Sequence, residues 1–131
     1  MRRAACVGAA LIALASGCGG AAGDLMSIDI GGGPTRERHT VVVSGDGRGS
    51  CDRGPLKQLP ADRVLDARGI DRDVGDLVRR AAVYPPRPGA RRYAVRTHDG
   101  EVRWSEGSPG IPSVLPRAQL LALQLERLLC R

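Results

Sequence analysis

The sequence predicts an α+β domain in which an antiparallel sheet of about four or five strands carries two main helices on one face. Short blocks in which apolar and polar residues alternate occur near the start of the chain and again after residue 90, which is the period of half-buried strands. Two longer blocks, ending near residues 81 and 129, repeat apolar residues at helical spacing. The order is two or three strands, a helix, a hairpin and a helix, and 131 residues allow one small domain.

Residues 1–17 have the pattern of a bacterial signal peptide. Two arginines precede an uncharged run at 4–15, which is shorter than the roughly 20 residues of a membrane-spanning helix. The ending Leu14-Ala15-Ser16-Gly17-Cys18 is similar to the lipobox, whose cysteine receives a diacylglyceryl group before cleavage. We therefore expect Cys18 to become a lipidated N-terminus on the extracytoplasmic face of the cell membrane. The alternative is ordinary secretion, with cleavage behind Ala15.

Two further cysteines suit an exported domain. Residues 18–25 are a flexible tether rich in glycine and alanine, and residues 26–131 form the folded domain. This domain contains Cys51 and Cys130, and two thiols outside the cytosol predict one disulfide, closing a loop of about 80 residues. The alternative is two unrelated thiols, one buried and one near the C-terminus.

Two strands and a possible third are predicted before the first helix. Residues 26–30 alternate apolar and polar side chains, and the glycines and proline of residues 31–34 end this strand. Residues 39–44 form the second strand. A turn at 45–47 then leads to a possible short strand at 48–52.

The middle of the chain predicts one helix. Residues 59–68 are compatible with either a short helix or an extended edge. The apolar residues that follow have helical spacing and share one face: Ile70, Val74, Leu77, Val78 and Ala81. Asp71 or Asp73 is expected to cap the free amides of this helix.

The C-terminal part predicts a hairpin and a second helix. Three prolines in the connector at 84–89 exclude a helix and a central strand. Tyr93 and Trp104 lie on alternating segments that flank a His-Asp-Gly turn, which is typical of a β-hairpin, and are the aromatic candidates for the core. A helix is predicted for residues 114–129. Its expected inner stripe is Ala118, Leu121, Leu125 and Leu128, broadened by Leu120, Leu123 and Leu129.

No set of residues in the sequence predicts catalysis, a metal site or a cofactor. His39 and His98 have no Cys, Asp or Glu at metal-ligand spacing, so a strand-edge role and a turn role are expected. Asp99 and Glu101 flank a turn and are interpreted as turn residues rather than as an acid–base pair. The glycine-rich segment 45–50 lacks the lysine of a phosphate loop and the ligands of a calcium loop.

The net charge is +6, and almost all of the positive charge is carried by arginine, since Lys57 is the one lysine. Four arginines gather around the proline connector and are the predicted binding residues: Arg87, Arg91, Arg92 and Arg96. Such a cluster fits anionic lipid head groups or cell-wall polymers. Nucleic acid is not expected as a partner, because the chain is predicted to be exported and has almost no aromatic residues for stacking.

The segment Arg92-Tyr93-Ala94-Val95-Arg96-Thr97-His98-Asp99-Gly100-Glu101-Val102-Arg103-Trp104, with the proline loop and leucine-rich helix after it, resembles the end of emfourin-type domains. The glycine break at 31–33 and the helix before the connector are also similar. Some proteins with such domains inhibit thermolysin-like metalloproteases. The resemblance therefore implies an α+β fold and a protease as one possible partner.

These observations lead to a ranked set of functional hypotheses. The first is a non-enzymatic lipoprotein that binds another envelope or secreted protein through the loops at 31–38 and 106–112. The second is a module that binds an anionic envelope component through the arginine cluster. The third is an enzyme that would have to use scattered Asp, Glu and Arg residues.

Overall fold

The computed structural model describes residues 23–131, so the predicted signal peptide and Cys18 lie outside the described residues. The elements in chain order are β1 (Asp24–Gly32), β2 (His39–Ser44), β3 (Arg48–Cys51), β4 (Lys57–Gln58), α1 (Ala61–Asp73), α2 (Gly75–Arg79), β5 (Arg91–Thr97), β6 (Gly100–Ser105) and α3 (Val114–Leu129). Among these, no helix is long and apolar enough to span a lipid bilayer.

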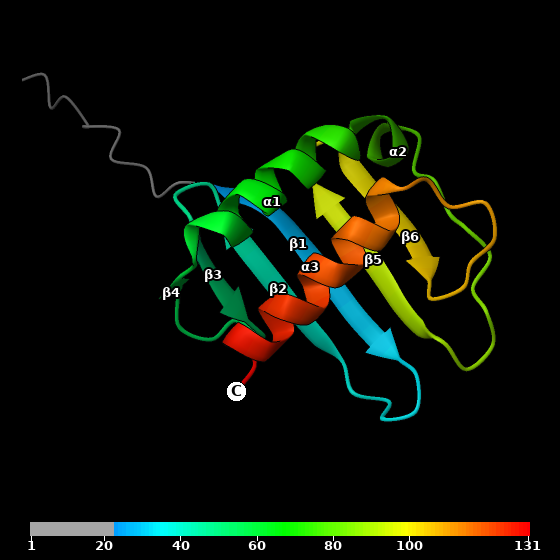
Figure 1. Ribbon diagram of the computed structural model, residues 1–131, viewed down its shortest axis with the longest axis horizontal. Helices are drawn as coiled ribbons and strands as arrows, with labels where there is room; N and C mark the ends of the chain where they lie inside the picture. Colours follow the sequence, from blue (N-terminus) through cyan, green and yellow to red (C-terminus); the bar gives the residue numbers. More distant parts are fainter. Residues whose placement is uncertain (1–22) are drawn as a thin grey trace, which may run out of the picture.

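The α+β class and the antiparallel sheet are confirmed. The sheet has six strands in the order β4-β3-β2-β1-β5-β6, and helices α1 and α3 lie across one of its faces (Figure 1). The prediction of four or five strands missed β4. This strand consists of two exposed polar residues, Lys57 and Gln58, which pair with β3 and carry no alternating pattern.

The register of the central strands explains why one face of the sheet is apolar. Ile28 of β1 lies opposite Val41 of β2 and Val95 of β5, and all three are fully buried. Because side chains alternate along a strand, the residues between them point to the other face. Asp29 and Ala94 are such a pair, and no helix covers them.

The first helical region begins earlier than the sequence predicts. Helix α1 starts at Ala61, so the ambiguous segment 59–68 is mostly helical, and Asp71 and Asp73 do not cap its start. Pro60 occupies the cap position without a side-chain hydrogen bond. The first turns of α1 carry few buried apolar residues, which is why periodicity did not reveal them. The predicted face is buried up to Val78, whereas Ala81 is exposed and has a positive φ of 50°.

Helix α3 spans the predicted residues, but its buried stripe differs at the end. Ala118, Leu121 and Leu125 are buried as predicted. Leu128, assigned to the inner stripe, is 45% exposed, and Leu129 is buried in its place. A Cβ atom on Gly49 of β3 would lie only 2.9 Å from Leu129 Cδ1, so the missing side chain of this glycine makes room for Leu129.

A disulfide joins Cys51 at the end of β3 to Cys130 just after α3, with an S–S distance of 2.04 Å. The predicted pairing is confirmed. The bond ties the end of the last helix to the edge half of the sheet, where Leu129 of α3 packs over Gly49 of β3.

Two aromatic rings form the centre of the other half of the core. Tyr93 and Trp104 are paired across β5 and β6, and their ring centroids lie 5.5 Å apart in a stacked arrangement. The Tyr93 hydroxyl donates a hydrogen bond to Glu106 Oε1 at 3.0 Å. Burial, and then this bond to a carboxylate, raise the pKa of Tyr93 well above its ordinary value.

This raised pKa predicts a loss of stability in alkaline solution. The folded protein keeps the phenol protonated, whereas the unfolded chain releases the proton above about pH 10. Stability should therefore be unaffected by this group below that pH and should fall as the pH rises above it. Urea unfolding at about pH 8 and about pH 11 measures the fall, and Tyr93→Phe should make it smaller. An equal fall in both proteins would show that Tyr93 is not responsible.

Candidate functional site

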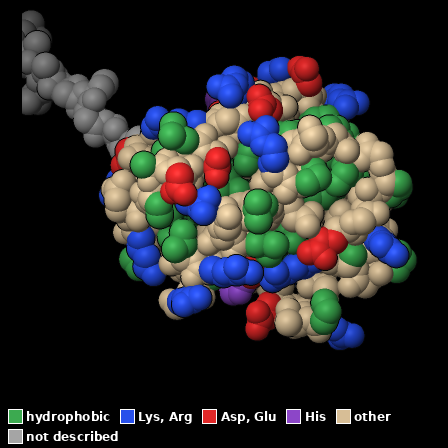
Figure 2. All heavy atoms as spheres, viewed as in Figure 1, with side chains coloured by type: hydrophobic (Ala, Val, Ile, Leu, Met, Phe, Trp, Pro, Cys, Tyr) green, Lys and Arg blue, Asp and Glu red, His purple; other side chains and the backbone are tan. Residues whose placement is uncertain are grey.

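The sheet face that no helix covers carries a groove of about 730 Å³. Its floor is formed by the outer side of β1 and β5, including Gly31 and Ala94. One wall is the β1–β2 loop, and the other is the proline connector beside β6. In contrast, Figure 2 shows the helix-covered face, where basic and acidic side chains are interspersed with apolar ones.

The glycine run at 31–33 shapes the first wall. Gly32 and Gly33 have φ values of 70° and 76°, which side chains disfavour, and this conformation turns the chain out of β1. The side chain of Arg38 lies over Gly31, where an added Cβ would be 3.3 Å from Arg38 Cγ. The glycines that the sequence analysis interpreted as a strand end therefore also make room for arginine side chains.

The proline connector forms the second wall because it is attached to β6. Val83 makes a parallel bridge with Arg103, and the Tyr84 amide donates to the Arg103 carbonyl at 2.9 Å. Ser108 Oγ donates to the carbonyl of Pro85 at 2.9 Å. The connector thus runs along the outer edge of β6, which is consistent with the expectation that its prolines exclude a central strand.

The groove is positively charged. Arg36, Arg38 and Arg92 line it, and within residues 23–131 none of them has a carboxylate oxygen within 4.0 Å. The acidic group in the groove, Asp29, is already engaged: it accepts hydrogen bonds from Arg96 at 2.9 Å and from Thr40 at 2.8 Å. Three guanidinium groups therefore remain free to bind an anion.

The four arginines predicted as a binding cluster do not share one surface. Arg92 lines the groove, and Arg96 lies on the same face but is paired with Asp29 and Glu101. Arg91 points to the opposite face, where it binds Glu126 of α3 at 2.9 Å. Arg87 lies on the connector, and its backbone amide donates to Ser105 Oγ at 2.8 Å. Neighbouring positions on β5 alternate between the two faces, which separates residues that are adjacent in sequence.

The two predicted contact loops also have different positions. The loop at 31–38 forms a wall of the groove. The loop at 106–112 contributes no residue to the groove lining, and Ser108 within it is buried and hydrogen-bonded to Pro85 and to the Ser105 amide. Arg36 and Arg38 were not singled out in the sequence because nothing local distinguishes them from other arginines on loops.

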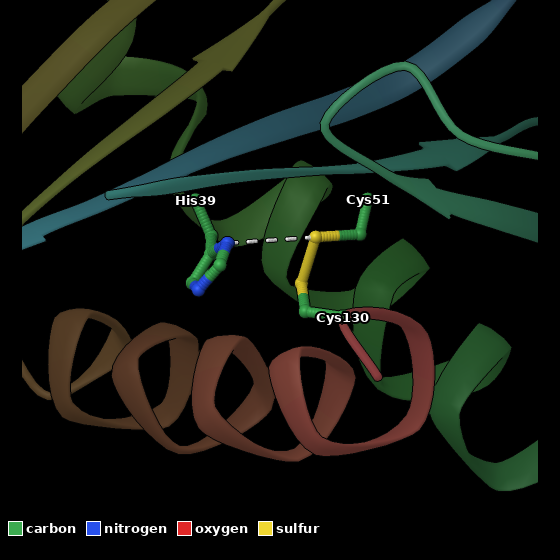
Figure 3. A group of neighbouring side chains, drawn as sticks. All are labelled: His39, Cys51 and Cys130. Carbon is green, nitrogen blue, oxygen red and sulfur yellow. Dashed lines mark hydrogen bonds between the residues drawn. A yellow bond between two sulfur atoms is a disulfide. The ribbon is translucent and has the colours of Figure 1, made fainter. Parts of the chain in front are cut away.

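A second cluster lies at the start of β2, next to the groove, whose lining includes His39. Figure 3 shows the His39 ring directed toward the disulfide between Cys51 and Cys130, with His39 Nδ1 3.8 Å from Cys51 Sγ. The potential ligand atoms of these three residues all lie within 4.8 Å of one another. Sequence spacing did not reveal this, because His39 and Cys51 come from neighbouring strands and Cys130 from the far end of α3.

Carboxylates surround the His39 ring. Asp52 Oδ2 is 2.7 Å from Nδ1, and Glu126 Oε1 is 3.9 Å from Nε2. Hydrogen bonds from His39 and from the Thr40 amide lower the pKa of Asp52, so this carboxylate stays ionised. Asp52 and the next residue, Arg53, have φ values of 49° and 61°, and the resulting tight turn directs the Asp52 side chain back toward β2.

Comparisons with known proteins add no assignment. No protein-family model matches the chain, and neither the curated proteins nor the solved structures contain a significant match to it.

Proposed function

We propose that this protein is a lipid-anchored, extracytoplasmic and non-enzymatic binding protein. Its groove binds an acidic segment of another envelope or secreted protein. The observation that carries the proposal is the set of three arginines without carboxylate partners in one groove: Arg36, Arg38 and Arg92. Anchoring through Cys18, which lies outside the described residues, would hold the protein at the membrane surface.

A peptide segment fits the groove better than a lipid surface or a uniform anionic polymer. A concave site excludes a flat bilayer from its floor. Its lining is mixed, because apolar atoms of Val83, Tyr84 and Ala94 lie beside the guanidinium groups. Arginine binds carboxylates through two parallel hydrogen bonds, and the apolar lining provides contact for neighbouring side chains of a peptide. Anionic lipid or cell-wall polymer remains the alternative ligand.

The sharper version of the proposal names the partner as a thermolysin-like metalloprotease. One observation supports this version. The glycines at 31–33, which are part of the resemblance to emfourin-type domains, begin the loop at 31–38, and this loop forms one wall of the groove. The assay is inhibition of such a protease by the purified protein in micromolar excess. Without inhibition, this version is rejected while the groove itself can still bind another acidic partner.

Binding of a synthetic glutamate-rich peptide tests the groove. Because a hydrogen bond to a charged group contributes about 1.5–3 kcal/mol, Arg92→Gln should weaken binding about tenfold or more. Arg127→Gln is a matched control, since Arg127 is an exposed arginine of α3 on the helix-covered side. Fluorescence anisotropy with a labelled peptide measures both affinities.

Four further measurements separate the possible ligands. A glutamine-rich peptide of equal length should bind much more weakly, and added salt should weaken binding of the acidic peptide. Anionic lipid vesicles and a phosphate-containing cell-wall polymer are titrated in parallel. Stronger binding of vesicles or polymer than of the acidic peptide, or equal loss in Arg92→Gln and Arg127→Gln, would overturn the peptide proposal.

A further inference from the structure

We infer that His39, Cys51 and Cys130 form a zinc-type metal site when the disulfide between the two cysteines is reduced. This inference does not rest on the proposed function: Cys51 and Cys130 are not part of the groove lining, although His39 borders the groove. Two thiolates and one imidazole are a ligand set that proteins use for Zn²⁺.

The positions of the ligand atoms suit a tetrahedral ion. Ligands at about 2.3 Å for sulfur and about 2.0 Å for nitrogen, at tetrahedral angles, are about 3.6 Å apart. His39 Nδ1 and Cys51 Sγ are already 3.8 Å apart, and the His39 ring is directed toward the sulfur (Figure 3). Cys130 Sγ completes three ligands within 4.8 Å of one another. Once the S–S bond is opened, the two sulfurs can move to the separation that a shared ion requires.

Carboxylates border the three ligands. Asp52 Oδ2 is 2.7 Å from His39 Nδ1, closer than two ligands of one tetrahedral ion can lie, so a water molecule is the expected fourth ligand and Asp52 can accept a hydrogen bond from it. Glu126 Oε1, 3.9 Å from Nε2, is placed to accept the ring proton after a small rotation. A carboxylate behind the ligating imidazole is the usual arrangement at protein zinc sites, because it fixes the tautomer that leaves the other nitrogen free for the metal.

The metal ion binds in two steps, reduction of the disulfide and then coordination by the thiolates. A dithiol reductant gives two electrons and two protons to the disulfide, yielding the thiols of Cys51 and Cys130, and leaves as its own disulfide. Binding of M²⁺ then releases the two thiol protons, while the imidazole proton moves from Nδ1 to Nε2. The disulfide and the metal therefore exclude each other, and the redox state of the compartment selects between them.

Cobalt is the probe that tests this site. The full chain with Cys6→Ser and Cys18→Ser keeps Cys51 and Cys130 as its only thiols. After reduction with a phosphine and its removal under anaerobic conditions, we expect one Co²⁺ per chain. The bound ion should show the visible bands of tetrahedral coordination and thiolate charge transfer, and Zn²⁺ should displace it. The oxidised protein should show neither band.

Variants distinguish a built site from loose binding by two thiols. His39→Ala should weaken binding at least 100-fold, more than the loss typical of an outer partner. His98→Ala, which alters the exposed histidine of the hairpin turn, should leave binding unchanged. If the reduced chain unfolds, Zn²⁺ should restore its circular dichroism and raise its melting temperature, and His39→Ala should abolish that rescue. Absence of the bands and of the rescue, or equal metal binding by the reduced protein and its His39→Ala variant, would overturn the proposal.

Discussion

The double replacement of Cys51 and Cys130 by serine is expected to lower the free energy of unfolding by about 4 kcal/mol. The two cysteines are 79 residues apart in sequence, so their bond removes much of the freedom of the unfolded chain. A small domain has a total stability of roughly 5–15 kcal/mol, so this loss is a large share of it. The core contains no phenylalanine and is filled by aliphatic side chains around one tryptophan and one tyrosine, which leaves the bond especially important.

Urea unfolding followed by circular dichroism measures this loss, with the wild-type protein kept oxidised. The intact mass with and without reductant, after alkylation, reports whether the bond is present. Two freely alkylated thiols in the native protein, or a double variant as stable as the wild type, would contradict the account of how α3 is held to the sheet.

Replacement of Trp104 by alanine should lower the free energy of unfolding by about 3–5 kcal/mol. The Trp104 side chain is 2% exposed and stacks on Tyr93, and its Nε1 group donates to Gln119 Oε1 at 3.4 Å. Truncation therefore removes apolar contacts, leaves a cavity between β6 and α3 and breaks the aromatic pair.

Leu120→Ala is the control for this experiment. Leu120 is on α3 but 58% exposed, so its truncation should change stability by less than about 0.5 kcal/mol. Circular dichroism follows unfolding in both variants, because Trp104→Ala removes the only tryptophan fluorophore. Losses of similar size in the two variants would mean that the centre of the core lies elsewhere.

Sequence periodicity predicted the elements whose buried face gives a regular apolar pattern within their own residues. The alternation of β1 and the leucine spacing of α3 follow directly from side-chain geometry, and both are confirmed. Two elements were missed for the same reason. Strand β4 is short and exposed, and the first half of α1 buries little, so neither has an apolar pattern. The choice of Leu129 over Leu128 depends on the room above Gly49, which only the packed structure shows.

The candidate sites depend on long-range geometry and were less predictable. The sequence analysis placed Arg91 and Arg92 in one cluster because they are adjacent in the chain. Side chains alternate along a strand, so the two arginines lie on opposite faces of the sheet. The groove instead combines Arg92 of β5 with Arg36 and Arg38 of the β1–β2 loop, and this combination can be predicted only from the pairing of β1 with β5. The same holds for His39 and Cys51: each lies on the inner face of its strand, and only the pairing of β2 with β3 brings them together.

Nuclear magnetic resonance of the arginine side chains tests the central claim most directly. The guanidinium signals of the protein are recorded while a glutamate-rich peptide is added. We predict that the signals of Arg36, Arg38 and Arg92 shift together and saturate, while those of Arg91 and Arg127 on the helix-covered side stay in place. Shifts confined to the helix-covered side, or absent from all three groove arginines, would contradict the assignment of the uncovered sheet face as the binding surface.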